Sequence, residues 1–274
     1  MKYILNVLTI AIGFAFAAIA DVTLVSEDPS SLWTQDGNGV WSSPGVALGG
    51  SSTASFTATN PCLIKFKYRF VLTNCADDNK WSSYFECKRT YQGNEYYPFF
   101  SYQTEEWKEG TILLEDVSAA ENTLSFILSN NADCTATVYV KEITVLPLLS
   151  ETIGALTWFY VASGNNAAIV TVKDAEGNSP SCDVTVPATL ASGSLSVTEI
   201  VDDFLEYGEA TGLTIPDSVT RIGSRVACDC WQLTNVQIGA GVASIGENSF
   251  VGGAIQSITV ASANANYASY AGAL

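Results

Sequence analysis

The chain has 274 residues, with 28 acidic and 12 basic side chains, a formal net charge of −16 and no histidine. Binding of nucleic acid depends on Lys and Arg, so this acidity argues against a nucleic-acid partner. The absence of histidine excludes Ser-His-Asp and Cys-His catalytic sites and histidine-bound zinc. Catalysis by carboxylates alone, as in glycosidases, stays open, but no motif singles out a pair. We therefore predict no catalytic residue, no cofactor and no metal site.

Residues 1–20 have the features of a signal peptide. Lys2 supplies the positive start, residues 4–16 form an apolar run, and residues 18–20 form a small-x-small cleavage site before Asp21. The alternative is a membrane anchor, but the run is shorter than the roughly 20 residues of a spanning helix. No later run is longer. We expect a secreted or cell-surface protein, with no membrane insertion after cleavage.

Residues 21–150 are predicted to form an antiparallel β-sandwich. The region has about seven or eight short segments that are rich in β-branched and aromatic residues and separated by turn residues, without a helical period. In residues 64–70, apolar side chains alternate with Lys65, Lys67 and Arg69. This alternation is typical of a strand with one buried face, and a set of such strands indicates a two-sheet, mainly β domain.

The chain has seven cysteines, and export makes disulfides plausible for the four in the first half. Cys75 and Cys87 flank a polar loop, so we expect this pair, which leaves Cys62 with Cys134. Four cysteines allow three connectivities, and the other two stay open. Because seven is odd, at least one thiol is expected to be free or bonded to another chain.

Residues 151–274 contain an internal repeat. The segment Leu213–Gly223 is followed by the similar segment Val236–Gly246 after a step of 23 residues, and a third copy begins at Ile258. A period of about 20–29 residues with alternating apolar strand positions is typical of a leucine-rich-repeat solenoid. We therefore predict a short solenoid after the sandwich.

Each repeat is predicted to contribute one layer of this solenoid, because its apolar side chains are buried only by stacked neighbours. Pro216 ends a strand, and Gly223 and Gly246 allow the tight turn that follows. The chain stops at Leu274 inside what resembles another repeat, without a polar cap. We expect an apolar rung there, which either ends a truncated chain or pairs with another surface.

The segments Thr214–Gly223 and Gly246–Phe250 resemble BspA-type leucine-rich repeats, a family common in bacterial surface proteins and some protist ones. The resemblance covers roughly residues 155–274. It implies a leucine-rich-repeat fold and a role in adhesion or partner binding. The chain departs from the family at Ala227, where Phe is usual, so this rung is expected to be underfilled.

The first half resembles extracellular jelly-roll modules related to carbohydrate-binding and MAM-like domains. The resemblance implies a jelly-roll fold with Trp107 in its core, and Trp41 is also expected to be buried. Lys141-Glu142 stands near the place where such modules often carry Asp, so no role is carried over there. The resemblance lies in the order of the motifs Trp33–Gly37, Pro61–Phe70, Glu106–Gly110, Glu121–Phe126 and Tyr139–Val145.

Aromatic residues in predicted loops of the sandwich are the candidate ligand-binding residues. Exposed rings stack on sugars or anchor protein partners. Trp33, Trp81, Tyr96 and Tyr97 are the candidates, although burial in the core stays an alternative for Trp33 and Trp81. Tyr96 and Tyr97 are expected to be exposed, because adjacent rings on an extended segment cannot both face one core.

These features predict a secreted or cell-surface binding protein that recognises an extracellular protein or glycan, through the repeat face and the sandwich loops, and that is not an enzyme. The alternative is a carbohydrate-binding accessory module of an extracellular polysaccharide system. A carboxylate-only glycoside hydrolase comes third. Exposed, coplanar aromatic rings on the sandwich would favour a sugar ligand, and an aromatic-poor sandwich beside an exposed strand face would favour a protein ligand.

Overall fold

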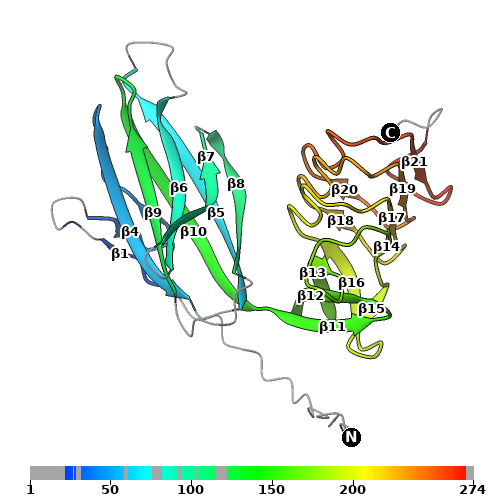
Figure 1. The fold of residues 1–274 in the computed structure, drawn as a ribbon. Coiled ribbons are helices and arrows are strands. Elements are labelled where there is room, and N and C mark those ends of the chain that lie inside the picture. The colour runs from blue at the N-terminus through cyan, green and yellow to red at the C-terminus, as the bar shows by residue number, and fades with distance from the viewer. Residues whose placement is uncertain are drawn as a thin grey trace, which may run out of the picture.

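The computed structural model describes residues 22–26, 28, 32–58, 61–75, 82–91, 94–102, 104–114 and 122–269. All regular elements named in these ranges are β-strands, as expected for a mainly β chain. Figure 1 shows two bodies side by side, a sandwich formed by β1–β10 and a stack of strands formed by β11–β21. The predicted signal peptide, residues 1–20, and Trp81 lie outside the described residues.

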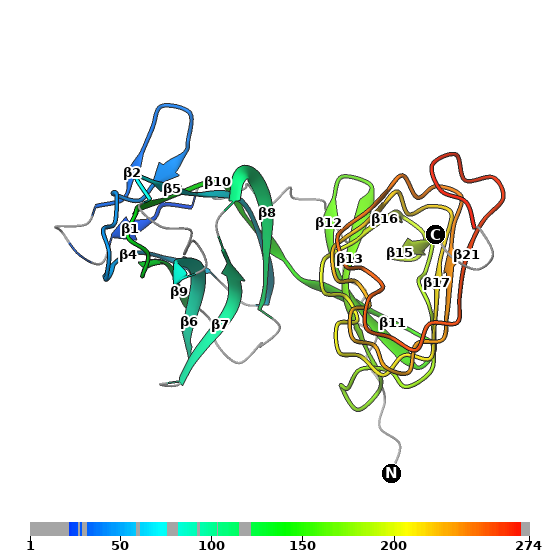
Figure 2. The same cartoon turned by 90° about the horizontal axis from the view of Figure 1, so that it is seen from above.

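The sandwich consists of two antiparallel five-stranded sheets, which confirms the predicted architecture (Figure 2). The β6–β7 sheet has the order β1-β4-β9-β6-β7, with strands Val25–Ser26, Gly50–Ala58, Asn122–Asn130, Tyr84–Tyr91 and Asn94–Ser101. The β5–β10 sheet has the order β2-β3-β10-β5-β8, with strands Thr34–Gln35, Trp41–Ser42, Thr135–Pro147, Cys62–Thr73 and Thr104–Leu114.

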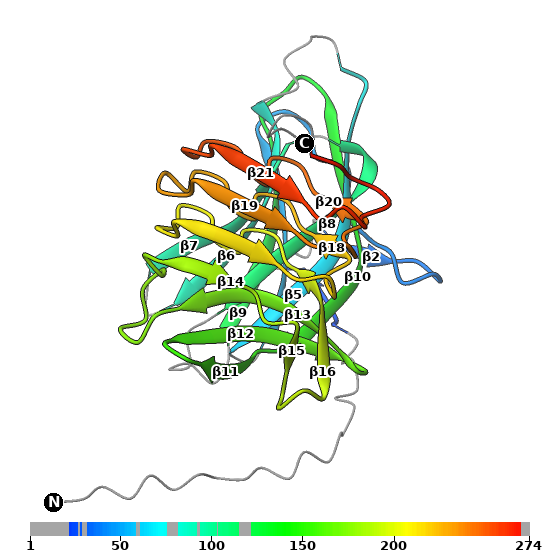
Figure 3. The same ribbon diagram turned by 90° about the vertical axis from the view of Figure 1, so that its right-hand side faces the viewer.

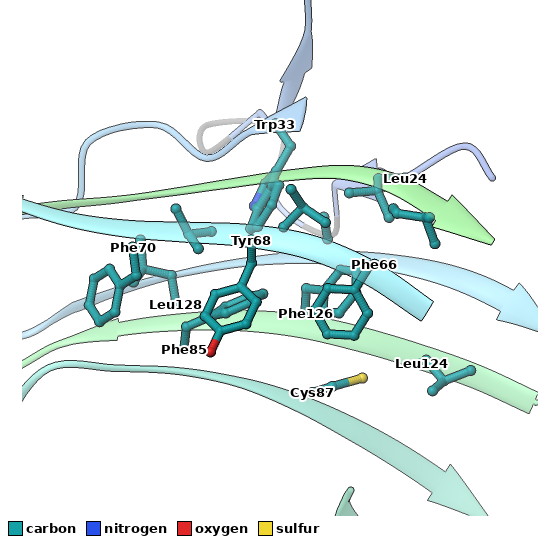
Figure 4. Close-up of a cluster of buried hydrophobic side chains, with 14 of the residues drawn as sticks. Leu24, Trp33, Phe66, Tyr68, Phe70, Phe85, Cys87, Leu124, Phe126 and Leu128 are labelled. Carbon is teal, nitrogen blue, oxygen red and sulfur yellow. The ribbon is translucent and has the colours of Figure 1, made fainter. Parts of the chain in front are cut away.

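Aromatic rings fill the space between the two sheets (Figure 4). Phe66 of β5 contacts Phe126 of β9 with ring centroids 5.0 Å apart, and Phe85 of β6 lies 5.4 Å from Phe126. Burial of each such side chain contributes about 1.5–3 kcal/mol. The predicted alternation in β5 is confirmed, because the apolar side chains are buried while Lys65 and Lys67 lie outside.

The predicted cysteine pairing is wrong: the disulfide joins Cys75 to Cys134, and Cys62 and Cys87 are free and buried. The reason is strand register. β5 pairs antiparallel with β10 so that the end of β5 lies beside the start of β10, which places the two bonded cysteines 4.3 Å apart at Cα. Cys87 instead points into the core. Cys62 is also buried, and this burial raises the pKa of its thiol to about 11.

The second body is a leucine-rich-type solenoid, as predicted. Its inner repeat sheet begins with β11 to β13 and continues through β16, β18 and β20. This sheet is on the side of the solenoid that faces the sandwich (Figures 1 and 2). These strands span Leu149–Ile153, Leu156–Ser163, Asn166–Lys173, Leu195–Ile200, Arg221–Ile222 and Ser244–Ile245, and β15, Thr189–Leu190, pairs with β16.

The outer repeat sheet faces away from the sandwich and is parallel (Figure 3). Leu213, Val236 and Ile258 are aligned from one repeat to the next. This alignment confirms the step of 23 residues from the first copy to the second and of 22 residues from the second to the third. Leu213 and Val236 are buried and fill the interior of the stack. Its strands are β14, β17, β19 and β21, which span Asp183–Thr185, Gly212–Ile215, Asn235–Ile238 and Ser257–Val260.

The repeat glycines serve close stacking of the backbone. A Cβ on Gly246 would lie 2.5 Å from the carbonyl carbon of Gly223 in the repeat below. Neither glycine has a positive φ, so the expected reason, freedom in a tight turn, is replaced by a lack of space for any side chain. Ala227 is fully buried, so its small side chain also lies within the stack.

Polar side chains cover part of the last rung. The Nδ2 of Asn264 donates hydrogen bonds to the carbonyl oxygens of Gly239 and Val242, at 2.9 and 3.0 Å. The backbone N–H of Val260 donates to Ser269 Oγ at 2.6 Å. These contacts satisfy backbone groups at this end of the described solenoid, while Val260 stays half-buried.

The two bodies meet through apolar and charged contacts. Leu63 of the sandwich belongs to one buried cluster with Val161, Val170 and Val201 of the solenoid. A hollow of about 330 Å³ with walls from both bodies is lined by three basic and three acidic side chains. They form ion pairs, with Lys65 Nζ 2.9 Å from Glu199 Oε1, Arg221 Nη1 2.8 Å from the same oxygen, and Arg221 Nη2 3.1 Å from Glu109 Oε2.

Candidate functional site

Exposed aromatic side chains of the sandwich gather along β7 and directly after it. Tyr96, Tyr97, Phe100 and Tyr102 are 48%, 52%, 48% and 43% exposed. Together with Tyr84 of the neighbouring strand β6, three of them form what we call the β7 aromatic patch, which comprises Tyr84, Tyr97, Phe100 and Tyr102. Exposed apolar surface of this kind is typical of sites that bind ligands or protein partners.

Strand register places this patch on the outer face of the β6–β7 sheet. Phe85 of β6 is buried, so Tyr84 and Glu86 on either side of it face outward. Phe100 pairs with Glu86 across the sheet and therefore also faces outward. The rings of Tyr84 and Phe100 stack with centroids 5.4 Å apart and an interplanar angle of 28°, and Tyr102 meets Phe100 edge-on at 4.9 Å.

A charged cluster orients Tyr97 at one end of the patch. The Tyr97 hydroxyl donates to Glu95 Oε2 at 3.0 Å, and Lys88 Nζ lies 3.1 Å from Glu95 Oε1. The hydrogen bond from Lys88 lowers the pKa of the Glu95 carboxyl, and the bond from Tyr97 adds to this. Glu95 thus stays ionised and raises the pKa of the Tyr97 hydroxyl, which keeps that hydroxyl a donor.

Neighbouring Glu86 has the opposite electrostatic setting. Its pKa is raised because partial burial on the sheet penalises the charged carboxylate, and Lys88 only partly offsets this. The patch therefore offers four rings with adjacent hydroxyl, carboxylate and ammonium groups. Rings bordered by a few oriented polar groups are the usual composition of a small-ligand surface.

The predicted ligand residues have different places in the structure. Tyr96 and Tyr97 are exposed, as expected. Trp33 is only 5% exposed and its Nε1 donates to Ser52 Oγ at 3.0 Å, so it lies in the core and is not available to a ligand. Trp81 is outside the described residues.

Two further tryptophans were expected in the core. Trp41 is half-buried and packs against the core. Trp107, however, does not join it: Arg69 and Lys141 contact its ring on the outer face of the β5–β10 sheet. The reason is parity, because residues of β8 alternate and Ile112 and Leu114 take the inward positions.

Sequence reasoning did not select Phe100 or Tyr102 as ligand residues. Both lie within a few residues of Tyr96-Tyr97, and the run of aromatic residues from 96 to 102 was the signal that could have found them. Only the pairing of β7 with β6 shows which of these rings share a face.

The outer repeat sheet is a second, chemically different surface. Thr185, Thr214, Gln237 and Thr259 form one row across its four strands, with side chains that alternate with the buried ones. A parallel row contains Asn235 and Ser257, whose side chains share a hydrogen bond of 2.9 Å. The strands of this face carry no aromatic residue, and Asp183 supplies their charge.

Two further observations concern the described part of the chain. It contains no group of three or more Cys, Asp or Glu side chains placed to hold a metal ion. Across the same ranges, no helix has the length and apolar character needed to cross a bilayer.

The fold defines the class of protein: a β-sandwich joined to a leucine-rich-type solenoid. Comparison of sequences specifies the repeat. Residues 193–271 match the BspA type leucine rich repeat region, with 6 copies, which confirms the resemblance seen in the second half. No curated protein matches the chain.

Three solved structures show limited similarity to parts of the chain. One is a leucine rich cell surface protein from Faecalibacterium prausnitzii A2-165, with 24% identity and a TM-score of 0.30 over 41% of this chain and 32% of that chain. Another is TmCBM61 in complex with beta-1,4-galactotriose, with 11% identity and a TM-score of 0.31 over 46% of this chain and 88% of that chain. A third is the secreted serine protease VesC from Vibrio cholerae, with 15% identity and a TM-score of 0.30 over 41% of this chain. The match spans 22% of the length of VesC.

Proposed function

We propose that this chain is an extracellular binding protein that recognises a saccharide through the β7 aromatic patch. The observation that carries the proposal is the grouping of Tyr97, Phe100 and Tyr102 on an exposed sheet face beside Tyr84. Aromatic rings present a flat apolar surface to the C–H face of a sugar, and polar groups at the rim bind its hydroxyls. Glu95, Lys88 and the Tyr97 hydroxyl are the rim groups here.

A secreted or cell-surface location supports this proposal. The leader features of residues 1–20 direct export, and the Cys75–Cys134 disulfide is of a kind that persists in oxidising compartments. The BspA-type match in residues 193–271 supports a binding role and no catalysis.

Affinity measurements on the mature chain test the proposal. A glycan array followed by calorimetry on the best ligand compares the wild type with Tyr97→Ala and Phe100→Ala. Each substitution is expected to lower affinity about tenfold or more, as for aromatic contacts at binding surfaces. Tyr96→Ala is the matched control, because Tyr96 has the same residue type and similar exposure but pairs with Arg89, on the side of β6 that carries buried Phe85.

Two outcomes would overturn the proposal. One is a mature chain that binds no saccharide on the array. The other is equal loss of affinity in Tyr96→Ala and Tyr97→Ala, since that would show no preference for the outer face. Circular dichroism and a melting curve for each variant separate lost binding from lost fold.

Protein adhesion through the outer repeat sheet is a second candidate function. The observation that favours it is the extended row of uncharged polar side chains, Thr185, Thr214, Gln237 and Thr259, on a face turned away from the sandwich. Such a flat face is suited to a broad partner surface. Gln237→Arg would place a charge at its centre, and cell or protein binding that survives this change would exclude the face as the contact surface.

A further inference from the structure

A second surface of the sandwich, the outer face of the β5–β10 sheet, carries a polar row that the proposed function does not use. Cross-strand pairing aligns Thr34, Ser42, Tyr139 and Arg69 on four consecutive strands. Neighbouring strands are about 4.8 Å apart, so the row is about 14 Å long. In Figure 2 this sheet lies on the side of the sandwich opposite the β6–β7 sheet, so the row and the β7 aromatic patch lie on different faces.

Arg69 lies between two rings at one end of this row. Its guanidinium carbon is 4.7 Å from the centre of the Tyr139 ring and 5.6 Å from the centre of the Trp107 ring. Lys141 Nζ lies 4.5 Å from the centre of the Trp107 ring. Stacking on aromatic faces holds a guanidinium in place while the donors in its plane stay free for an acceptor.

The guanidinium of Arg69 lacks an acceptor among the described residues. Its Nε is fully enclosed and makes no hydrogen bond, and its other nitrogens have no ion-pair or hydrogen-bond partner in the described ranges. The neighbouring cations differ in this respect, since Lys65 pairs with Glu199, and Lys67 and Lys141 share Glu142. An Arg in this setting is unusual because buried donors are nearly always satisfied.

Local charge also distinguishes this place from the rest of the chain. Three cations, Lys67, Arg69 and Lys141, stand beside two carboxylates, Glu142 and Glu109, and Glu109 also pairs with Arg221, whereas the whole chain has a formal net charge of −16. A positive site on a negative protein favours an anionic group that is small enough to approach one spot. It disfavours a large polyanion, which the remaining surface repels.

We propose that Arg69 binds the carboxylate or sulfate group of an acidic saccharide on this face. A carboxylate, or two oxygens of a tetrahedral sulfate, accepts two parallel hydrogen bonds from a guanidinium. The adjoining rings of Trp107 and Tyr139 and the hydroxyls of Ser42 and Thr34 then contact the sugar. The choice of a saccharide over an acidic peptide rests on the function proposed above and on this hydroxyl row.

The test compares charged and neutral forms of the same oligosaccharide. Calorimetry on the mature chain uses an oligogalacturonate, its methyl ester and a sulfated oligosaccharide. The acidic forms are expected to bind at least tenfold more tightly than the ester. Arg69→Gln is expected to remove this preference, and Arg69→Lys to restore part of it, because Lys keeps the charge but not the paired donors.

Lys65→Gln is the matched control. It removes the same charge from the same face of the same strand, but from a side chain that is already paired with Glu199. Its affinity for the acidic ligand is expected to change less than twofold. Equal losses of affinity in Arg69→Gln and Lys65→Gln would overturn the proposal, because they would indicate a general electrostatic attraction by the face and no specific binding site at Arg69.

Other outcomes separate this proposal from the first one. If Tyr97→Ala loses a neutral sugar while Arg69→Gln keeps the acidic preference, this inference fails and the β7 patch stands. If the preference for acidic ligands depends on Arg69 and no neutral sugar binds, this inference stands and the proposed saccharide site on the β7 aromatic patch fails. Displacement of the acidic sugar by a poly-glutamate peptide of equal charge at lower concentration would also overturn it. Melting curves show whether Arg69→Gln stays folded.

Discussion

The sandwich and the solenoid bury their interiors in different ways. The sandwich packs large rings, such as Phe66, Phe85 and Phe126, between its two sheets. This packing requires only that every second residue of a strand be apolar. The solenoid stacks small and branched side chains and brings backbone so close that Gly246 has no space for a Cβ above Gly223. Alternation leaves every outward position of the sandwich free to vary, whereas stacking restricts the solenoid at each repeat. Diverse binding chemistry is therefore expected on the sandwich.

The largest expected effect comes from removing a ring of the sandwich core. Phe126 contacts Phe56, Phe66 and Phe85, so Phe126→Ala opens a cavity in the middle of the ring cluster. The expected loss is about 3–5 kcal/mol of unfolding free energy. Denaturant unfolding monitored at several wavelengths measures it. A loss confined to one of two transitions would show that the two bodies unfold separately, and a single shifted transition would show coupling.

Removal of the disulfide is expected to be the next largest effect, again in the sandwich. Cys75 and Cys134 are 59 residues apart in sequence, so the bond restricts a long loop of the unfolded chain. The double substitution to Ser is expected to cost about 2–4 kcal/mol. Cys182→Ser, at an exposed free thiol in the solenoid, is the control and is expected to be neutral. Mass spectrometry that found Cys75 joined to Cys87 would contradict the structure directly.

Gly246→Ala tests the close stacking of the solenoid. The new methyl group would overlap the backbone of Gly223 and Ser224, which cannot move as a side chain does. The expected cost is about 1–3 kcal/mol. Gly37→Ala is the control, because nothing lies within 4 Å of its Cβ position and its φ is not positive. Equal stability of the two variants would show that the backbones of neighbouring repeats move apart at little cost to accommodate the methyl group.

The parts of the fold that the sequence predicted are those that depend on periodic patterns. Alternation at residues 64–70 and the 23-residue step in the second half both concern neighbours along the chain or along a stack. The disulfide depends on which strands pair and in what register, and Cys87 looked suitable only because it is near Cys75 in sequence. Register also explains Trp107, whose position on the outer face follows from Ile112 and Leu114 being inward.

The candidate sites were predictable only in part for the same reason. Tyr96 and Tyr97 could be predicted as exposed, because two adjacent rings cannot share one core. Trp33 could not be assigned, since its burial depends on a contact with Ser52 of a different strand. The basic row of β5 was visible as an outward face, but the rings that hold Arg69 come from β8 and β10. No local pattern brings these three strands together.

The charged part of the contact between the two bodies is expected to contribute little to stability. Glu199 is the shared acceptor of Lys65 and Arg221, and all three side chains are partly exposed to solvent. Glu199→Gln is therefore expected to cost about 1 kcal/mol or less, with the difference shrinking as salt is added. Thermal melting at low and high ionic strength measures it. A loss that is larger and independent of salt would show that the charged contact matters more than the apolar cluster around Leu63.

The smallest expected effect concerns two carboxylates beside the β7 aromatic patch and has a defined sign. The pKa of Glu95 is lowered by Lys88 and Tyr97, so its stabilising contribution is present above its unfolded pKa, about 4.3, and is lost as the pH falls through the lower folded pKa. The pKa of Glu86 is raised by burial, so its ionisation destabilises the fold and protonation relieves this as the pH falls through the raised folded pKa. Denaturant unfolding between about pH 3 and pH 7 should therefore show Glu95→Gln weakening the chain at the neutral end and Glu86→Gln strengthening it there. Shifts of the same sign would mean that Glu86 is not desolvated at its place on β6, and the two carboxylates would then differ only in their partners.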